Sequence, residues 1–322
     1  MTAHVRNLAI LGSTGSIGRS TLEVVAAAGG RFRVAGLTAH RRVSELLEQA
    51  RRWQPDWIVV TDPDAAQSLD RSQLPPHTQL FGSAHDVPQC VARPEIDVVV
   101  AAVVGAAGLA GTWAALEAGK RVALANKETL VMAGPLVMQL AARQGGQILP
   151  VDSEHSAVFQ ALQSGRREEV RRIVLTASGG PFRRHSLEQL EQVSVAEALA
   201  HPNWKMGPKI TVDSATMMNK SLEVIEARWL FDFPPDQIGV VVHPQSVVHS
   251  LVEYRDGSVL AQLSPPDMKL PIQYALTFPE RWEGPAAKLD WTSHFNLEFE
   301  KPDLNRFPAL QLGFEVADKG GT

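Results

Sequence analysis

The chain has 322 residues, of which 44% are hydrophobic and 20% are charged, and its net charge is −4. A length of this order predicts about two domains. A partner such as nucleic acid or an anionic membrane is not expected, because both attract a basic surplus that this chain lacks. Cys90 is the single cysteine, which excludes an internal disulfide and any multi-cysteine metal site. The first residues show no secretory pattern, so we expect a cytoplasmic protein.

The first 150 residues alternate short apolar runs with segments of helical periodicity. Strands buried on both faces and separated by helices are typical of a doubly wound parallel sheet, which binds ligands at the carboxyl ends of its strands. We therefore expect an α/β, Rossmann-like domain over residues 1–150. The expected strands are 8–12, 33–38, 57–60, 97–104, 121–125 and 147–151, and the expected helices are 16–28, 42–53, 112–118 and 129–144.

Residues 98–116 carry no charge and approach the length of a membrane-spanning helix. Gly105, Gly108 and Gly111 interrupt this run, and most of its other residues are alanine or valine. A buried strand, a glycine-rich turn and a helix account for this composition better than a membrane span.

The pattern changes beyond residue 150. Segments 173–176, 239–253 and 258–264 are predicted strands, several of them amphipathic enough for an antiparallel or mixed sheet, and 216–230 is a predicted helix. We assign 151–290 to an α+β catalytic domain. Residues 291–322 are assigned to an extended connector and the start of a helix at 308–318.

The sequence GSTGSIG at 12–18 follows an apolar strand and begins a helix. Glycines allow a tight turn and close backbone approach, and free N–H groups at a helix start attract a pyrophosphate. The spacing is GxxGxxG rather than the commoner GxGxxG, and glycines also end strands for steric reasons alone. Its place at the first strand–helix junction favours dinucleotide binding.

The turn after the second expected strand selects between the two nicotinamide cofactors. NAD-binding proteins usually place a carboxylate there, whereas this chain has His40-Arg41-Arg42. A guanidinium suits the 2′-phosphate of NADP, and the alternative is a solvated basic start of a helix. We predict NADP.

Two carboxylates, Asp152 and Glu154, follow the apolar run 148–151. On an extended segment their side chains point to the same side, which suits a hard divalent cation such as Mg²⁺ or Mn²⁺. An acidic N-terminal cap of the helical stretch 156–163 explains them equally well.

The predicted helix 216–230 offers a partner for these carboxylates. Asn219 and Glu223 share a face that Lys220 borders, and Glu223 would complete a three-carboxylate metal site. Ser214, Asn219 and Lys220 offer hydrogen-bond donors to a phosphate or to hydroxyls. The alternative, a solvated helix face, fits the apolar surroundings poorly.

Other segments suggest a lid and an anion site. Residues 201–208 combine an aromatic, a histidine and a Gly-Pro hinge, as in a mobile lid, although a surface loop is the alternative. Ser178 opens a glycine-rich strand end that resembles an anion-binding nest. For His243 and His249, both in an apolar strand, we favour satisfied core or interface histidines.

Taken together, these motifs resemble one family, the 1-deoxy-D-xylulose 5-phosphate reductoisomerases of the non-mevalonate isoprenoid pathway. The resemblance covers essentially the whole chain, and the block at 201–220 is long and specific. The matching segments are GSTGSIG (12–18), ANKE (125–128), VDSEHSA (151–157), SGGPF (178–182), HPNWKMGPKITVDSATMMNK (201–220), HPQSVVHS (243–250) and PPDM (265–268).

The resemblance implies an NADPH- and divalent-metal-dependent enzyme that is a homodimer and acts on a small-molecule sugar phosphate. The metal would be Mg²⁺, Mn²⁺ or Co²⁺, and the family's C-terminal helical domain, with which its members continue, is expected to be missing here. The implied NADPH contacts are Thr14, Gly15, Ser16, Ile17, Arg41, Asn126, Glu128 and Gly207. The implied metal ligands are Asp152, Glu154 and Glu223. The implied substrate contacts are Lys127, Ser153, Glu154, Ser178, His201, Trp204, Ser214, Asn219, Lys220 and Glu223, of which Ser178, Ser214, Asn219 and Lys220 would take the phosphate.

The implied reaction is a carbon-skeleton rearrangement of the ketose phosphate to an aldehyde, followed by hydride delivery from NADPH. Lys127, Asp152, Glu154, His201 and Glu223 would carry the chemistry. The chain departs from the family at His40-Arg41-Arg42, where Gly-Lys-Asn or Gly-Arg-Asn is common. Two alternatives are an inactive NADPH-binding fragment and a semialdehyde dehydrogenase, which would need Cys90 as its nucleophile.

Overall fold

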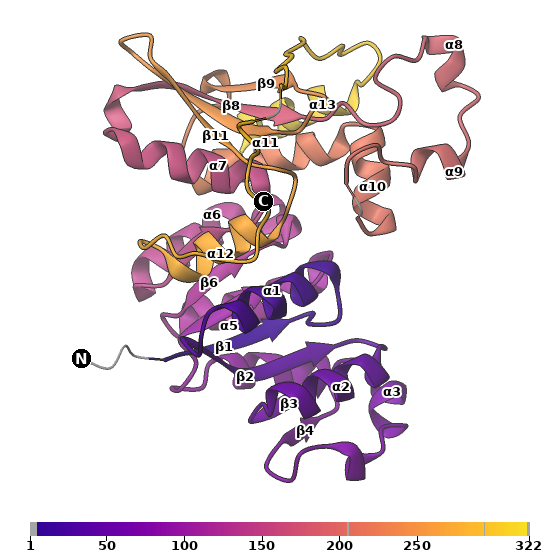
Figure 1. The fold of residues 1–322 in the computed structure, drawn as a ribbon, viewed down its shortest axis with the longest axis vertical. Helices are drawn as coiled ribbons and strands as arrows, with labels where there is room; N and C mark the ends of the chain where they lie inside the picture. The colour runs from indigo at the N-terminus through magenta and orange to yellow at the C-terminus, as the bar shows by residue number, and fades with distance from the viewer. Residues whose placement is uncertain (1–4, 205, 293, 321–322) are drawn as a thin grey trace. The chain divides into compact units, whose positions relative to one another are not determined.

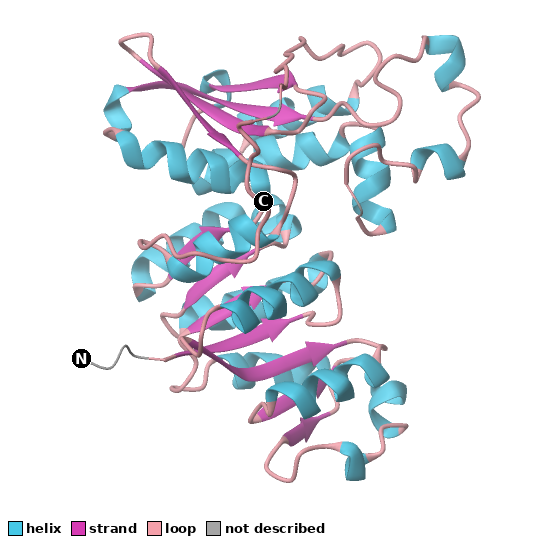
Figure 2. Ribbon diagram, in the orientation of Figure 1, coloured by secondary structure: helices cyan, strands magenta, loops and turns pink. Residues whose placement is uncertain are grey.

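Two separate sheets organise the chain in the computed structural model, which describes residues 5–204, 206–292 and 294–320 (Figure 1). Within these residues, a seven-stranded sheet belongs to one compact unit, residues 1–151 with 268–286, and a four-stranded sheet to another, residues 152–267 with 287–322. Figure 2 shows helices packed around the strands of both sheets.

The sheet of the first unit is parallel throughout, in the order β4-β3-β2-β1-β5-β6-β7. Residues 8–11 of β1 and the whole of β3 are apolar because both faces of these strands are covered, and Leu8 and Trp57 are fully buried. The expected doubly wound fold is thereby confirmed. The strands are β1 (Arg6–Leu11), β2 (Phe32–Ala39), β3 (Trp57–Val60), β4 (Gln79–Phe81), β5 (Val98–Ala101), β6 (Arg121–Leu124) and β7 (Gln147–Pro150), and the helices are α1 (Ser16–Ala27), α2 (Val43–Trp53), α3 (Pro63–Gln67), α4 (Val87–Val91), α5 (Leu109–Glu117) and α6 (Lys127–Gln144).

Helix α12 (Lys269–Thr277) returns to this first unit, although the sequence placed it in the domain 151–290. It packs on α1 and on the β6–β7 side of the sheet with Ile272 and Leu276 fully buried. Arg6 donates to the Leu276 carbonyl at 2.7 Å, and Arg121 donates to the Phe278 carbonyl at 2.9 Å. The unit is therefore assembled from two stretches of chain.

The sheet of the second unit is mixed, in the order β11-β10-β8-β9. Strand β10 is antiparallel to β8 and β11, while β8 and β9 are parallel. The elements are α7 (Ser153–Ala161), β8 (Val170–Ala177), α8 (Leu187–Leu190), α9 (Val195–Ala198), α10 (Pro208–Ala215), α11 (Met218–Leu230), β9 (Ile238–Val242), β10 (Val248–Tyr254), β11 (Val259–Leu263) and α13 (Ala309–Lys319).

Two expected elements of this unit are divided in the structure. The expected strand 239–253 is two strands, β9 and β10, on opposite sides of β8; Pro244, which has no N–H to donate, lies in the turn between them. The expected helix 216–230 begins later, because Met217 adopts a left-handed conformation (φ 59°) that separates α10 from α11.

Helix α13 packs closely on α11. A side chain at Gly313 would place its Cβ 2.6 Å from the Cα of Ser221, so glycine is required for this approach. The Ser221 hydroxyl donates to the Ala309 carbonyl in the same contact. The helix that carries Asn219, Lys220 and Glu223 is thus supported from behind by the C-terminal segment.

The uncharged run 98–116 forms β5, a turn and α5, as the sequence predicted. Among the described residues, no helix combines the length and the apolar character needed to cross a membrane.

Candidate active site

The glycine turn after β1 has no room for side chains. A Cβ at Gly12 (φ 80°) would lie 2.7 Å from the Ala102 carbonyl oxygen, and one at Gly18 would lie 2.4 Å from the Gly12 carbonyl oxygen. Helix α1 begins without a side-chain cap and without an acidic residue in its first turn. Its free N–H groups and positive dipole end suit a pyrophosphate, and β1 and β5 are the strands at which the order of the sheet reverses.

Buried polar contacts fix the shape of this turn. The Ser13 hydroxyl donates to Gln49 Oε1 at 2.7 Å, and Gln49 Nε2 returns a hydrogen bond to the Ser13 carbonyl. Arg42 donates to the Thr14 carbonyl at 2.7 Å. Thr14 is buried and Ser16 is exposed at the start of α1, so the four predicted cofactor contacts at 14–17 line one short segment.

The basic turn after β2 uses its two arginines differently. Arg42 holds the glycine turn, whereas the exposed Arg41 donates Nε to Asp62 at 2.7 Å. The N–H of Ala65 and the Arg41 guanidinium lower the pKa of Asp62, which therefore stays ionised. The contact with Asp62 uses Nε, and the terminal nitrogens of a guanidinium are donors suited to a phosphate.

Asn126 organises the loops beside β5 and β6. Its Oδ1 caps α6 by accepting from the Thr129 N–H at 3.0 Å, and its Nδ2 donates to the Val103 and Gly105 carbonyls and to Glu128. The predicted cofactor contact at Asn126 is thus a side chain already engaged in holding the loop. Lys127 opens the same helix and is buried.

The three predicted metal ligands lie together in the second unit. Carboxylate oxygens of Asp152, Glu154 and Glu223 all lie within 4.8 Å of one another. The side chains of Asp152 and Glu154 are 16% and 18% exposed, and that of Glu223 is fully buried. Asp152 directly precedes α7, and Glu154 lies in its first turn. The two explanations drawn from the sequence, an acidic helix start and a carboxylate pair, therefore both apply to this segment.

A buried ammonium contacts two of these carboxylates. Lys220 Nζ donates to Glu154 at 2.8 Å and to Glu223, and these charges raise the pKa of Lys220 although burial alone would lower it. Asn219 Nδ2 donates to Glu223 at 2.6 Å. The other amide atom, Asn219 Oδ1, is buried and has no hydrogen-bond partner among the described residues, which leaves an acceptor for a ligand hydroxyl.

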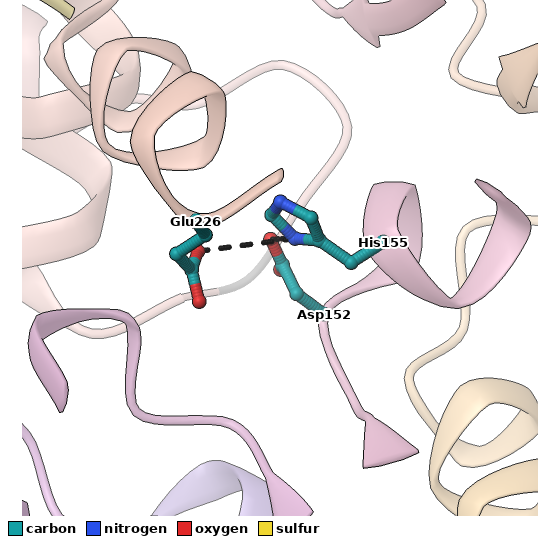
Figure 3. Close-up of side chains that lie close together, drawn as sticks. All are labelled: Asp152, His155 and Glu226. Carbon is teal, nitrogen blue, oxygen red and sulfur yellow. Dashed lines mark hydrogen bonds and ion pairs between the residues drawn. The ribbon is translucent and has the colours of Figure 1, made fainter. Parts of the chain in front are cut away.

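Behind the carboxylates lies a histidine that the site prediction did not include. Figure 3 shows the His155 ring close to the carboxylates of Asp152 and Glu226. Its Nδ1 is 3.2 Å from Asp152 Oδ2 and 3.8 Å from Glu226 Oε2, while its Nε2 is 2.9 Å from the Glu223 carbonyl oxygen. Both nitrogens face acceptors, so the ring donates from both. Burial lowers the pKa of His155, but Glu226 and Asp152 outweigh it and raise the pKa to about 9.

The donor set fits a divalent cation. Four carboxylates (Asp152, Glu154, Glu223 and Glu226) and two cations (Lys220 and His155) give −4 + 2 = −2 among these six side chains. Hard oxygen ligands with this residual charge match Mg²⁺ or Mn²⁺. The two partly exposed carboxylates leave the group accessible from solvent.

A second polar cluster joins the loop after β8 to the segment before α10. His201 Nδ1 accepts from the Asn203 and Trp204 N–H groups, so Nε2 carries the proton and donates to Ser178 Oγ at 3.0 Å. Burial lowers the pKa of His201, consistent with a neutral ring. The Gly180 N–H also donates to Ser178 Oγ, which leaves the Ser178 hydroxyl hydrogen available to an anion.

Ser214 lies beside this cluster. A Cβ built on Gly180 would lie 2.8 Å from the Ser214 carbonyl oxygen, so the glycine loop rests on the end of α10. Gly179 and Gly180 both have positive φ, a conformation that glycine adopts readily. The two predicted phosphate serines are therefore neighbours.

The predicted lid, residues 201–208, contacts the turn after β9, although its Lys205 lies outside the described residues. Asn203 donates to the Pro244 carbonyl at 2.6 Å, and the Trp204 ring lies 6.2 Å from the His249 ring. Gly207 is exposed and precedes α10. His249 is buried and contacts Ser264, as expected of a satisfied histidine.

His243 is also satisfied, as expected. It is fully buried, with Nδ1 2.8 Å from the Glu298 carbonyl oxygen and its ring stacked on Phe299. Cys90 is fully buried as well, and burial raises the pKa of its thiol to about 11. A buried thiol of this kind does not serve as a thioester nucleophile, so the semialdehyde dehydrogenase alternative loses its central residue.

Comparison with known proteins places these sites in one family. Residues 8–134 match the family model of 1-deoxy-D-xylulose 5-phosphate reductoisomerase, residues 148–231 match the model of its C-terminal domain, and residues 263–322 match a further model described as the DXP reductoisomerase C-terminal domain. The reductoisomerase of Heliobacterium modesticaldum is 54% identical over 99% of this chain and 82% of its own length, and that of Chlorobium chlorochromatii is 53% identical over 99% and 83%.

Solved structures agree. A reductoisomerase in complex with NADPH, fosmidomycin and magnesium is 46% identical, with a TM-score of 0.92 over 98% of this chain and 80% of that one. The enzyme of Zymomonas mobilis in complex with NADPH is 45% identical, with a TM-score of 0.91 over 98% and 82%. On this sequence identity and coverage, the chain belongs to the 1-deoxy-D-xylulose 5-phosphate reductoisomerase family.

Proposed function

We propose that this chain catalyses the NADPH- and divalent-metal-dependent rearrangement and reduction of 1-deoxy-D-xylulose 5-phosphate to 2-C-methyl-D-erythritol 4-phosphate, in isoprenoid precursor biosynthesis. The observation that carries the proposal is the meeting of Asp152, Glu154 and Glu223, whose carboxylate oxygens lie within 4.8 Å of one another next to a buried lysine. The family membership agrees with this chemistry.

The three carboxylates are the residues that would hold the metal ion, Mg²⁺, Mn²⁺ or Co²⁺. When bound, the ion supplies Lewis-acid polarisation of the substrate's carbonyl and hydroxyl oxygens. Glu154, partly exposed at the start of α7, is the carboxylate best placed to exchange a proton with a bound hydroxyl. The buried Asn219 Oδ1 accepts from a substrate hydroxyl and helps to orient the carbon skeleton.

The phosphate group of the substrate is assigned to Ser178, Ser214, Asn219 and Lys220. Ser178 contributes a hydroxyl hydrogen that His201 directs, because the His201 N–H occupies the acceptor side of the same oxygen. Trp204 would close over the bound molecule and exclude water. Lys127 and Ser153 complete the proposed substrate contacts.

NADPH supplies the hydride that reduces the rearranged aldehyde. In the first unit, the N–H groups at the start of α1 would bind its pyrophosphate and Arg41 its 2′-phosphate, with Thr14, Gly15, Ser16 and Ile17 along the turn. Asn126, Glu128 and Gly207 are the further proposed contacts, and the Asn126 side chain also shapes the adjoining loop. A cytoplasmic location and a homodimer belong to the same proposal.

The test is the loss of NADPH absorbance when the purified chain is mixed with 1-deoxy-D-xylulose 5-phosphate and Mg²⁺ or Mn²⁺, with and without a chelator. We expect oxidation that stops when the chelator is added and resumes when excess metal is restored. Product analysis should identify 2-C-methyl-D-erythritol 4-phosphate. Folded protein that binds NADPH but never turns over would contradict the proposal and favour an NADPH-binding fragment.

A further inference from the structure

Glu226 is a buried carboxylate next to the proposed metal ligands. It follows Glu223 by about one turn of α11, its side chain is 6% exposed, and its Oε2 lies 3.8 Å from His155 Nδ1 (Figure 3). A carboxylate at this depth has lost its hydration, and an apolar side chain would fill the same space at lower cost. The charge at this position therefore calls for an explanation.

His155 connects Glu226 to two of the three metal-ligand residues. One ring nitrogen faces the Asp152 carboxylate, and the other faces the main-chain carbonyl of Glu223. The ring thus spans from the first turn of α7 to the middle of α11, the two segments that carry all three ligands. A rotation of this ring would break both contacts at once.

We propose that Glu226 is a positioning residue for the metal site. Through the 3.8 Å ion pair, its carboxylate favours the His155 ring orientation that donates to both Asp152 and the Glu223 carbonyl, and so helps to fix the separation of the ligands on α7 and α11. Outer partners of this kind orient metal ligands, and their loss typically lowers metal affinity about 10–100-fold. The inference rests on the metal-dependent function proposed above, because it assigns Asp152 and Glu223 to the ion.

The decisive experiment compares Mn²⁺ binding by the whole chain and by Glu226→Gln, with free Mn²⁺ followed by its electron paramagnetic resonance signal. The variant keeps the shape of the side chain and removes its charge. We expect the Mn²⁺ dissociation constant to rise about 10–100-fold, while NADPH affinity stays unchanged. At saturating Mn²⁺ most of the turnover number should return, because the ligands themselves are intact.

Glu253→Gln is the matched control. Glu253 is a carboxylate of the same unit that accepts from Arg171 and Arg172 on β8, outside the metal-ligand group. Its loss should leave the Mn²⁺ dissociation constant within twofold of that of the unsubstituted chain. A Glu226→Gln chain that is folded and also stays within twofold would overturn the inference.

Two further variants keep the test open if Glu226→Gln does not fold. Glu226→Asp retains the charge on a shorter side chain and should bind Mn²⁺ with a smaller loss. His155→Asn removes the connection itself and should lower Mn²⁺ affinity as much as Glu226→Gln does. In the double variant, Glu226→Asp should lower Mn²⁺ affinity little further, since the two residues act through one contact. Additive losses, or unchanged Mn²⁺ affinity in His155→Asn, would contradict the inference.

The outcome is separable from that of the proposed function. If the unsubstituted chain binds Mn²⁺ but never converts 1-deoxy-D-xylulose 5-phosphate, the function fails while the effect of Glu226 on Mn²⁺ binding still stands. If turnover is present and Glu226 has no effect on Mn²⁺ binding, only the positioning role fails.

Discussion

The glycine turn of the first unit and the carboxylate group of the second are built in opposite ways. The turn is a continuous stretch of seven residues in which backbone N–H groups would do the proposed binding, so its requirement is the absence of side chains. The carboxylate group is drawn from segments about 70 residues apart, and its side chains depend on buried partners such as Lys220 and His155. The glycine turn depends on steric fit within one short segment, whereas the carboxylate group depends on electrostatic contacts between segments that the fold brings together.

This difference predicts two kinds of damage. A side chain added to the turn should displace backbone and reduce both stability and cofactor binding. A charge removed from the carboxylate group should leave the fold largely intact and act on metal or substrate. Four substitutions test the division, in order of decreasing expected effect.

Glu223→Gln should cause the largest loss. It removes the fully buried member of the carboxylate group, which is also the acceptor for Asn219 and Lys220. Metal-dependent turnover should fall by more than the ~10–100-fold expected for a supporting residue. NADPH binding, measured by fluorescence, should be unchanged; a variant with normal metal-dependent turnover would show that Glu223 is not a ligand.

Gly18→Ala should damage the turn sterically. Its Cβ would lie 2.4 Å from the Gly12 carbonyl oxygen and 2.5 Å from the Ser13 Cα, and neither backbone atom can rotate away. Overpacking of this kind costs about 1–3 kcal/mol of unfolding free energy, measurable by denaturant titration. NADPH affinity should fall about tenfold or more, while Mn²⁺ binding should be retained. Gly239→Ala, where the nearest contact is an ordinary 3.4 Å, is the matched control.

Ser178→Ala should affect the substrate more than the metal. The hydroxyl is held by His201 and Gly180 with its hydrogen directed outward. Losing a hydrogen bond to a charged group costs about 1.5–3 kcal/mol, so KM for the sugar phosphate should rise at least about tenfold. Steady-state kinetics should show little change for Ser258→Ala, on the turn between β10 and β11. An unchanged KM in Ser178→Ala would remove this serine from the phosphate site.

Arg41→Ala should have the smallest effect, confined to the choice of cofactor. The arginine is exposed and bound through Nε to Asp62, so its loss should leave the fold unaltered. The preference for NADPH over NADH, measured as the ratio of kcat/KM values, should fall about tenfold. Arg33→Ala, which breaks a comparable pair with Asp56 on the same sheet, should leave the ratio unchanged. An undiminished preference in Arg41→Ala would assign the 2′-phosphate elsewhere.

The local features and the three-carboxylate group were predictable, whereas the residues that support that group were not. The parallel sheet follows from apolar runs that alternate with helices, and the glycine turn follows from its spacing. The three-residue β4 is too short to leave a periodic signal. The capping of α6 by Asn126 was not predicted, although an asparagine at a helix start commonly accepts from the N–H three residues on. Its contact with the cofactor stays a prediction.

The residues that support the carboxylate group could not be predicted from a local sequence pattern. His155 stands inside a recognised motif and Glu226 three residues after a recognised ligand, but their contact depends on how α7 and α11 pack. Nothing in the sequence distinguishes a buried Glu226 from a solvated helix face. His155 and Glu226 are identified as supports of the carboxylate group by their burial in the structure more than by their residue types.

The return of α12 to the first unit has a consequence for biosynthesis. Arg6 donates to the Leu276 carbonyl, and α12 packs on α1, so segments whose residues are 270 positions apart belong to one unit. Domains generally fold as they emerge, but this one lacks a structural partner until about residue 286 has been synthesised. The side of α1 that packs on α12 therefore stays exposed in the nascent chain until residues 152–267, which carry the second sheet, have been synthesised. Expressing residues 1–150 alone would leave the same side of α1 exposed permanently, and such a fragment should aggregate more readily than the full chain.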